Sequence, residues 1–89
     1  MAVINNTEKH RYELDTDGQI TFADYKRDGK TLTIMHVEAP LSLRGAGVAG
    51  QLMQGMLDQA RSEGLKVVPV CSYAAMWIQR HKDYHDLLQ

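Results

Sequence analysis

The first third of the chain alternates hydrophobic and polar residues, as short β-strands do. Residues Arg11–Leu14 alternate in this way and stop at Asp15–Gly18, where an Asp-Gly pair favours the positive φ of a tight turn. A second strand is expected over Gln19–Lys26, and its hydrophobic spacing slips from two to three near Ala23–Asp24, which indicates a bulge. The pair Asp28–Gly29 then predicts a second turn.

A third strand is expected over Thr31–Val37, and Pro40 ends it because proline has no backbone donor for a strand ladder. Period-two alternation predicts one face made of Leu32, Ile34 and His36 and an opposite face made of Thr33, Met35 and Val37. Because both sets contain hydrophobic residues, we expect both faces to be covered and this strand to be the central one.

The second half of the chain carries a helical pattern. After a glycine-rich run, hydrophobic residues recur with helical spacing at Ala49, Leu52, Met53, Met56, Leu57 and Ala60. Gly64 is expected to end this helix. Gly55 inside it costs about 1 kcal/mol relative to alanine, which predicts a close contact at that position. A short buried strand, Leu65–Val70, follows.

A second helix is expected from Tyr73 to about Lys82, capped by the preceding serine, with Tyr84–Gln89 as its fraying continuation. The order of elements is therefore βββαβα. The strand-helix-strand unit from Thr31 to Val70 forms a right-handed crossover with parallel strands. The predicted fold class is α/β (α+β), a mostly antiparallel sheet with one parallel pair and two helices, in a single domain over residues 1–89.

Composition and charge narrow the class of protein. The 89 residues are 44% hydrophobic and 24% charged, as in a soluble globular protein. A formal net charge of -1 gives no overall basic character, so nucleic acid is not expected as a partner. The longest apolar run is far shorter than the roughly 20 residues that span a bilayer. The single cysteine, Cys71, leaves no intramolecular disulfide, so we expect a cytoplasmic protein. We also expect a monomer with no membrane segment.

The glycine-rich run Arg44–Gly50 stands at the predicted start of the first helix. Unpaired backbone N–H groups and the positive end of the helix dipole suit such a position to an anion, with Arg44 as an additional donor. The alternative is a structural role, in which Gly45 and Gly47 only form a tight turn.

Two other phosphate-binding motifs fit this run poorly. A Walker A motif requires Gly-Lys-Ser/Thr at its end, and none follows. The three glycines match a dinucleotide fingerprint literally, but residues 38–44 separate them from the preceding strand. The acidic ribose ligand expected about 20 residues further on is also absent, because that position holds Cys71 or Ser72.

A third motif fits better. The Arg/Gln-x-x-Gly-x-Gly/Ala turn of the GNAT superfamily of N-acetyltransferases is matched at Arg44, Gly47 and Ala49. Further matches occur in the order seen in the compact GNAT-like domains, at His36-x-x-x-Pro40, Leu43-Arg44-Gly45, Leu65-Lys66-Val67 and Cys71-x-Tyr73. Over nearly the whole chain, the sequence resembles these short acetyl-CoA-binding proteins. It lacks the helical segment after the first strand and the final hairpin of full-length acetyltransferases, which favours an open site for a large acceptor.

The resemblance implies that acetyl-CoA, as cosubstrate, lies between the His36 strand and the Val67–Val70 strand. It also implies that the pyrophosphate lies on the backbone N–H groups of the glycine-rich turn. The cofactor-binding residues expected on this basis are Val37, Arg44, Gly45, Ala46, Gly47, Val48, Ala49 and Cys71.

Three residues are candidates for the chemistry. Cys71 ends a strand just before a helix start, which favours a nucleophilic thiolate, although a lone cysteine is commonly a small buried hydrophobic residue. His36 is the candidate general base for an amine, or else a core histidine bonded to a backbone carbonyl. Tyr73 is the candidate proton donor to the departing CoA thiolate, or else it packs against Trp77.

The expected function is an acetyl-CoA-dependent N-acetyltransferase that acts on an unidentified amine, either a small molecule or a protein. An alternative is a module that binds CoA or acyl-CoA without transferring it, and a third is a nucleotide-binding interaction domain. No metal is expected, because His81 and His85, four residues apart, lack a third ligand at metal spacing.

Overall fold

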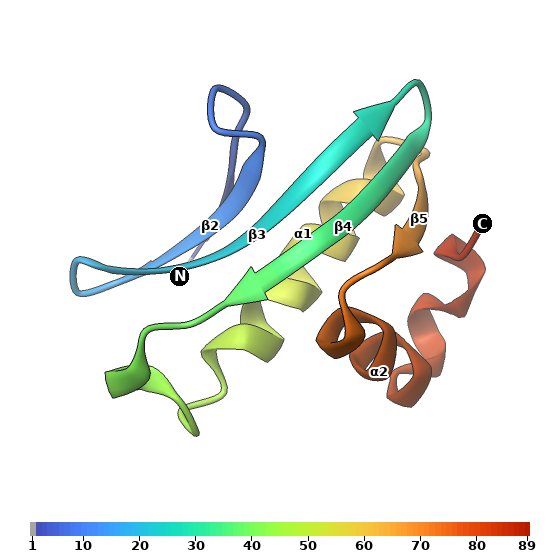
Figure 1. Cartoon of the computed structure of the whole chain (residues 1–89). Helices are drawn as coiled ribbons and strands as arrows, with labels where there is room; N and C mark the ends of the chain where they lie inside the picture. The colour runs from blue at the N-terminus through green and yellow to red at the C-terminus, as the bar shows by residue number, and fades with distance from the viewer. Residues whose placement is uncertain (1) are drawn as a thin grey trace.

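The computed structural model describes residues 2–89, in which one five-stranded sheet packs against two helices (Figure 1). The strands follow sequence order across the sheet: β1 (Val3–Asn6), β2 (Arg11–Thr16), β3 (Gln19–Asp28), β4 (Thr31–Glu38) and β5 (Lys66–Pro69). The helices are α1 (Val48–Ser62) and α2 (Ser72–Arg80), with 3-10 segments η1 (Leu41–Leu43) and η2 (Lys82–Leu87). Neighbouring strands are antiparallel except β4 and β5, which confirms the mixed sheet with one parallel pair.

The core forms where the inward face of the sheet meets α1, which passes behind β3 and β4 in Figure 1. Alternate residues of β2, β3 and β4 point inward and are buried, namely Tyr12, Leu14, Thr21, Ala23, Tyr25, Leu32 and Ile34. The predicted helical stripe is fully buried at Leu52, Met53, Met56, Leu57 and Ala60. Each fully buried leucine contributes about 1.5 to 3 kcal/mol relative to an exposed one, so burial of this stripe holds α1 in place.

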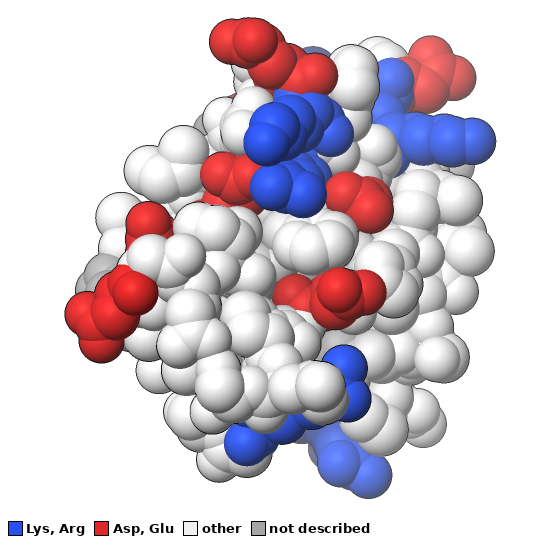
Figure 2. Space-filling model, turned by 60° about the vertical axis from the view of Figure 1, so that its left-hand side comes forward, with Lys and Arg blue, Asp and Glu red and all other residues white. Residues whose placement is uncertain are grey.

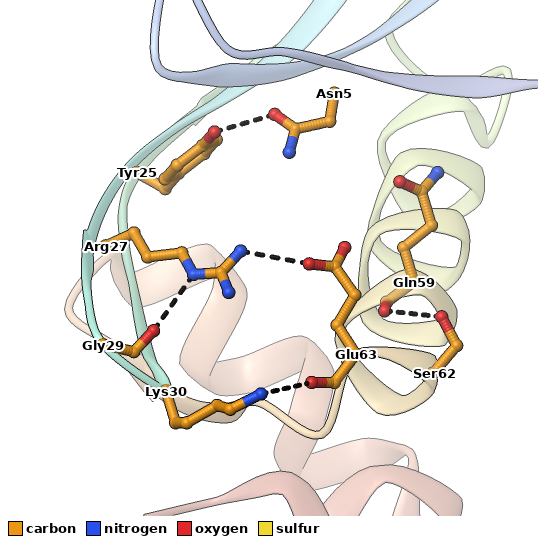
Figure 3. Close-up of polar contacts among 8 residues, drawn as sticks. All are labelled: Asn5, Tyr25, Arg27, Gly29, Lys30, Gln59, Ser62 and Glu63. Atoms are coloured by element: carbon orange, nitrogen blue, oxygen red, sulfur yellow. Dashed lines mark hydrogen bonds and ion pairs between the residues drawn. The ribbon is translucent and has the colours of Figure 1, made fainter.

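The structure adds a strand that the sequence pattern did not predict. β1 lies at the edge of the sheet beside β2, and its Val3 side chain packs on Gly55 of α1. A Cβ atom at Gly55 would overlap the valine side chain. Gln59 Nε2 also donates to the Val3 carbonyl at 2.7 Å. Tyr25 OH donates to Asn5 at 2.7 Å (Figure 3). The glycine inside the helix is therefore the point at which α1 accommodates β1.

β4 carries one extra residue relative to β3. Asp24 is opposite His36 and Tyr25 is opposite Ile34, so Met35 has no residue opposite it. The predicted bulge is confirmed in position, but the inserted residue belongs to β4 and not to β3. A bulge of this kind reverses the inward and outward alternation beyond it.

The reversal corrects the expected faces of β4. Leu32 and Ile34 point inward, but His36 lies on the opposite face with a side chain that is 55% exposed. Val37 takes the inward place and packs against the core. The expectation of one face shared by Leu32, Ile34 and His36 is wrong, as is that of two covered faces. β3, third of the five strands, is the central strand.

The turn between β3 and β4 is tied to the end of α1 by polar contacts (Figure 3). Arg27 pairs with the Glu63 carboxylate at 3.0 Å, and Lys30 Nζ donates to the Glu63 carbonyl at 3.3 Å. Glu63 is the C-cap of α1 and is followed by Gly64, which has the left-handed conformation. The contacts fix the far end of the helix relative to the sheet, while the glycine-rich run fixes its start.

The last residues do not continue α2, so the expected helical continuation over Tyr84–Gln89 is wrong. η2 turns back toward the sheet, and Leu88 forms a parallel bridge with Val67 of β5. Tyr84 is buried and its OH donates to Asp58 of α1 at 2.8 Å. Burial is the main cause that raises the pKa of Tyr84 to about 12, followed by the hydrogen bond to Asp58. Burial of hydrophobic residues against α1 and β5 overrides the helical continuation here.

Replacing Gly55 with alanine is predicted to lower the free energy of unfolding by up to about 2 kcal/mol. Overpacking costs about 1 to 3 kcal/mol, which exceeds the gain of about 1 kcal/mol in helix propensity. Urea denaturation measures the change, with Gln51→Ala on the exposed side of α1 as a control that changes little. The double variant Val3→Ala/Gly55→Ala should recover part of the loss, and a stabilised Gly55→Ala protein would contradict the close contact.

Candidate functional site

The chain between β4 and α1 forms a tight, ordered turn. In η1 and the residues after it, Arg44 N–H donates to the Leu41 carbonyl at 3.2 Å and Ala46 N–H to the Leu43 carbonyl at 3.0 Å. Gly45 and Gly47 have φ values of 88° and 79°, a region that side chains with a Cβ rarely adopt. These two glycines are what the turn requires to enter the helix.

The first turn of α1 presents backbone donors to the solvent. Gly47 is the N-cap, and its carbonyl accepts the first intrahelical bond from Gln51 N–H at 3.1 Å. The N–H groups of Val48, Ala49 and Gly50 precede that bond and therefore lack an acceptor within the helix. The positive end of the helix dipole adds to their attraction for an anion.

These donors face a cleft of about 590 Å³ between the end of β4, the turn and α2. Its lining residues are His36, Val37, Glu38, Ala39, Leu43, Arg44, Gly45, Gly47, Val48, Ala49, Gly50 and Tyr73. The cleft lies beyond the point at which β4 and β5 separate. Val70 and Cys71 both donate their N–H groups to the Ile34 carbonyl at 3.0 Å, and β5 makes no register pair with β4 beyond that point.

The cleft brings together most of the residues that the sequence nominated for a ligand. Arg44 and the turn residues line it, together with Val37, His36 and Tyr73. Ala46 and Cys71 are not among the lining residues. Glu38, Ala39, Leu43 and Gly50 were missed. Glu38 could have been found, because it stands two residues after His36 on a predicted strand and therefore shares its face.

Cys71 occupies the predicted strand end as the N-cap of α2. It is partly buried and packs against the hydrophobic core, which fits the structural alternative as well as the nucleophilic one. Tyr73, two residues later, has a raised pKa, mainly because of burial and then because of the neighbouring Cys71. A raised pKa keeps the phenol protonated near neutral pH, so Tyr73 is able to donate a proton.

In the described part of the chain, no ring contact joins Tyr73 to Trp77, and both side chains pack against the core. Trp77 stacks on His81 with ring centroids 3.6 Å apart and contacts Tyr84 at 5.5 Å. Its Nε1 lies against Gly50, where an added Cβ would be 3.3 Å from that atom. The indole therefore braces the first turn of α1 from the side of α2.

His36 is not the core histidine of the structural alternative. Its exposed ring contacts Glu38, with Nε2 3.0 Å from Oε1 of the carboxylate. The ring of Phe22, on the neighbouring strand, has its centroid 6.3 Å from that of the imidazole. His36 therefore lies at the rim of the cleft, where solvent reaches it.

The positive charge at the cleft comes from Arg44 and from the start of α1. Arg44 is exposed, and within residues 2–89 no acidic side chain forms an ion pair with it. On the face shown in Figure 2, acidic and basic side chains are interspersed among wide uncharged areas. A negatively charged ligand would therefore find one uncompensated guanidinium and the helix N-terminus, and no broad basic surface.

The two histidines near the C-terminus serve the fold. His81 Nδ1 donates to the Trp77 carbonyl at 2.6 Å, and His85 Nε2 donates to the Ile78 carbonyl at 2.9 Å. Over residues 2–89, no three side chains of histidine, cysteine, aspartate or glutamate come close enough to hold a metal ion. In the same range, no helix has both the length and the apolar character needed to cross a membrane.

Comparison with known proteins identifies the family. The profile of the GCN5-related N-acetyl-transferases matches residues 11–87, from the start of β2 to the end of η2. The chain belongs to this family. A solution NMR structure of a GCN5-like protein from Staphylococcus aureus has the same fold, with a TM-score of 0.70 at 20% sequence identity. The match covers 98% of this chain and 86% of that one. The GNAT resemblance and the predicted fold class are therefore confirmed.

Replacing Gly47 with alanine is predicted to lower the free energy of unfolding by about 1 to 2 kcal/mol, because the left-handed conformation costs a side chain that much. No atom outside the turn lies within 4 Å of the added methyl group, so backbone strain is the only cost. Thermal and urea denaturation measure the loss. Ala46→Gly, in the same turn, is the control for a simple change in loop flexibility. A Gly47→Ala protein as stable as the unmodified protein would contradict the requirement for glycine.

Proposed function

We propose that this GNAT-family chain binds acetyl-CoA in the cleft and transfers the acetyl group to an amine. The observation that carries the proposal is a cleft at the end of β4, beyond its last pair with β5, that is lined by the turn and by the unpaired N–H groups that begin α1. A long anionic thioester needs both features, since its phosphates require donors and its acyl end requires a channel.

The pyrophosphate belongs at the helix start. Its oxygens would accept hydrogen bonds from the N–H groups of the first turn of α1, with the Arg44 guanidinium as a charged donor beside them. The positive φ at Gly47 favours glycine, and because glycine has no side chain, a phosphate can approach the backbone there. The resemblance of Arg44, Gly47 and Ala49 to the GNAT turn supports the same placement.

The pantetheine arm and the acetyl group belong between β4 and β5. Beyond Ile34, the backbone groups of β4 that point toward β5 meet no partner strand, so they are available to an extended ligand. This arrangement would bring the thioester into the cleft that His36 and Tyr73 line. Cys71, the N-cap of α2, comes two residues after β5 and is not among the lining residues.

Direct transfer needs a base and an acid on opposite sides of the thioester. A neutral amine attacks the carbonyl carbon, the C–N bond forms, the C–S bond breaks, and the proton on nitrogen passes to His36. The departing CoA thiolate takes a proton from Tyr73, whose raised pKa keeps it protonated. The alternative is a relay, in which the Cys71 thiolate first takes the acetyl group and then passes it to the amine.

A second candidate function is a CoA-binding module that does not transfer the acyl group. The exposure of both His36 and Glu38 favours it, since no segment of residues 2–89 covers the acceptor side of the cleft. The same openness suits a large acceptor such as a protein amine. A turnover assay over a panel of amines separates the two, because only a transferase releases CoA above background.

The proposal includes a single functional domain, a monomeric state and a cytoplasmic location. These rest on the sequence, whose length fits one domain and whose only cysteine leaves no intramolecular disulfide. Sedimentation of the purified protein over a range of concentrations tests the monomer directly.

Replacing Arg44 with alanine is predicted to weaken CoA binding by roughly 1 to 3 kcal/mol, the range for a lost hydrogen bond to a charged group. Added salt should weaken binding of the unmodified protein, because it screens the same charge. NMR titration with CoA should shift the amides of Gly45 to Ala49 first. Arg80→Ala on α2 removes an equally exposed arginine and serves as the matched control.

Titration with three phosphate-containing ligands tests whether the turn binds phosphate. CoA, dephospho-CoA and NAD are titrated in parallel against the same amides. Shifts with the two CoA species support the proposal, and a preference for NAD would support a nucleotide-binding domain instead. If none of the three shifts the turn, its glycines are structural only.

Incubation with acetyl-CoA is predicted to leave Cys71 unmodified, because direct transfer is the mechanism that GNAT-family membership favours. Peptide mass spectrometry after incubation measures this, with Cys71→Ala as the control. A hydroxylamine-sensitive acetyl group on the Cys71 peptide, formed fast enough for turnover, would establish the relay. Full transfer activity in Cys71→Ala would exclude it.

A further inference from the structure

The strand that borders the cleft carries an ionisable pair, His36 and Glu38. Residues two apart on a strand share a face, and the bulge at Met35 turns this pair away from the core. Nε2 of the imidazole is 3.0 Å from Oε1 of the carboxylate, and both residues line the cleft. Without the inserted residue, both side chains would point into the core, where neither could meet an acceptor.

The contact decides which ring nitrogen can accept a proton. An ionised carboxylate only accepts hydrogen bonds, so Nε2 of His36 must carry the hydrogen that lies between the two side chains. In a neutral imidazole, the other nitrogen, Nδ1, then keeps its lone pair. Within residues 2–89, Nδ1 of His36 has no hydrogen-bond partner. Glu38 thus leaves Nδ1 as the basic atom.

The neighbouring strands support this pairing without competing for it. Phe22 of β3 is opposite Glu38 in register, and its ring forms a wall beside the imidazole. Arg11 of β2 lies over the Phe22 ring at 4.6 Å, but its charge is taken up by Glu13 at 2.6 Å. Arg11 is therefore already paired with Glu13, and Glu38 contacts His36.

Three other charged or titratable groups face this end of the cleft or its strand. Asp24 is opposite His36 in register and on the same face, but its carboxylate makes no hydrogen bond to the imidazole in the described chain. Arg44 and Tyr73 line the cleft from the turn and from α2. Asp24 therefore adds negative charge near His36 without selecting a ring nitrogen, which makes it a matched control for Glu38.

We infer that Glu38 is a positioning residue, which holds His36 in the tautomer whose Nδ1 accepts the proton of the attacking amine. The inference rests on the proposed function. As the C–N bond forms and the C–S bond breaks, the proton leaves nitrogen for Nδ1, and the positive charge that appears on the ring is stabilised by the carboxylate on Nε2. The imidazolium then returns its proton to water, and CoA leaves with the electron pair of the C–S bond.

Glu38→Gln is the test variant, because an amide can donate as well as accept and so no longer selects one tautomer. Nitrogen-15 NMR of the imidazole, recorded above the pH at which the ring titrates, reports which nitrogen carries the hydrogen. The unmodified protein should show only the Nε2–H form, and the Nδ1–H form should appear in Glu38→Gln. For an accepted amine, kcat should fall about 10- to 100-fold, as with other residues that orient a functional histidine, while the KM for acetyl-CoA stays unchanged. Asp24→Asn should change neither measurement.

The outcomes separate this inference from the function on which it rests. A wild-type protein that acetylates an amine while Glu38→Gln matches its kcat overturns the role of Glu38 alone. So does an Nδ1–H ring in the unmodified protein, or an equal loss of activity in Asp24→Asn, which would make the effect one of general charge. A wild-type protein that binds acetyl-CoA and acetylates no amine overturns the proposed function and the role of Glu38 with it.

Discussion

One inserted residue in β4 governs the rest of the site. Met35 has no residue opposite it in β3, and from that point the strand presents the opposite set of side chains to each face. Residues before the bulge, such as Ile34, build the core, and residues after it, such as His36, line the cleft. The same strand therefore contributes to the core at one end and to the cleft at the other, and the bulge is the boundary between them.

β4 and β5 separate at Ile34, the residue just before the bulge at Met35. The Ile34 carbonyl accepts from both Val70 and Cys71, so the last bond between the two strands is shared and the ladder stops there. α1 then lies under the open end with its N-terminus at the mouth of the cleft, held by burial of its hydrophobic stripe and by contacts at both ends. The cleft lies at the end of β4, beyond its last bond to β5, and the first turn of α1 supplies backbone N–H donors to it.

Much of this could be predicted from the sequence because the deciding signals are local. The glycine-rich turn, the helical stripe of α1 and the Asp-Gly turns depend on neighbours within a few residues, and each of them is confirmed. The side of the sheet taken by His36 could not be predicted. In the folded β3, Thr21, Ala23 and Tyr25 alternate regularly inward, so the slip in hydrophobic spacing marked no extra residue there. Only the paired register shows that β4 carries the inserted residue. β1 was missed because four residues, Val3–Asn6, give too short a pattern, and its evidence lay 50 residues away in Gly55.

The last residues of the chain cover part of the outer edge of β5. β5 is the last strand of the sheet, and its outer edge would otherwise present unpaired backbone groups on which a foreign strand could add. Leu88 bridges to Val67, and Gln89 N–H donates to the Val67 carbonyl at 3.2 Å, so the chain closes part of that edge with its own last residues. This part of the β5 edge is thereby closed to strand addition, and β1 is the other edge strand of the sheet.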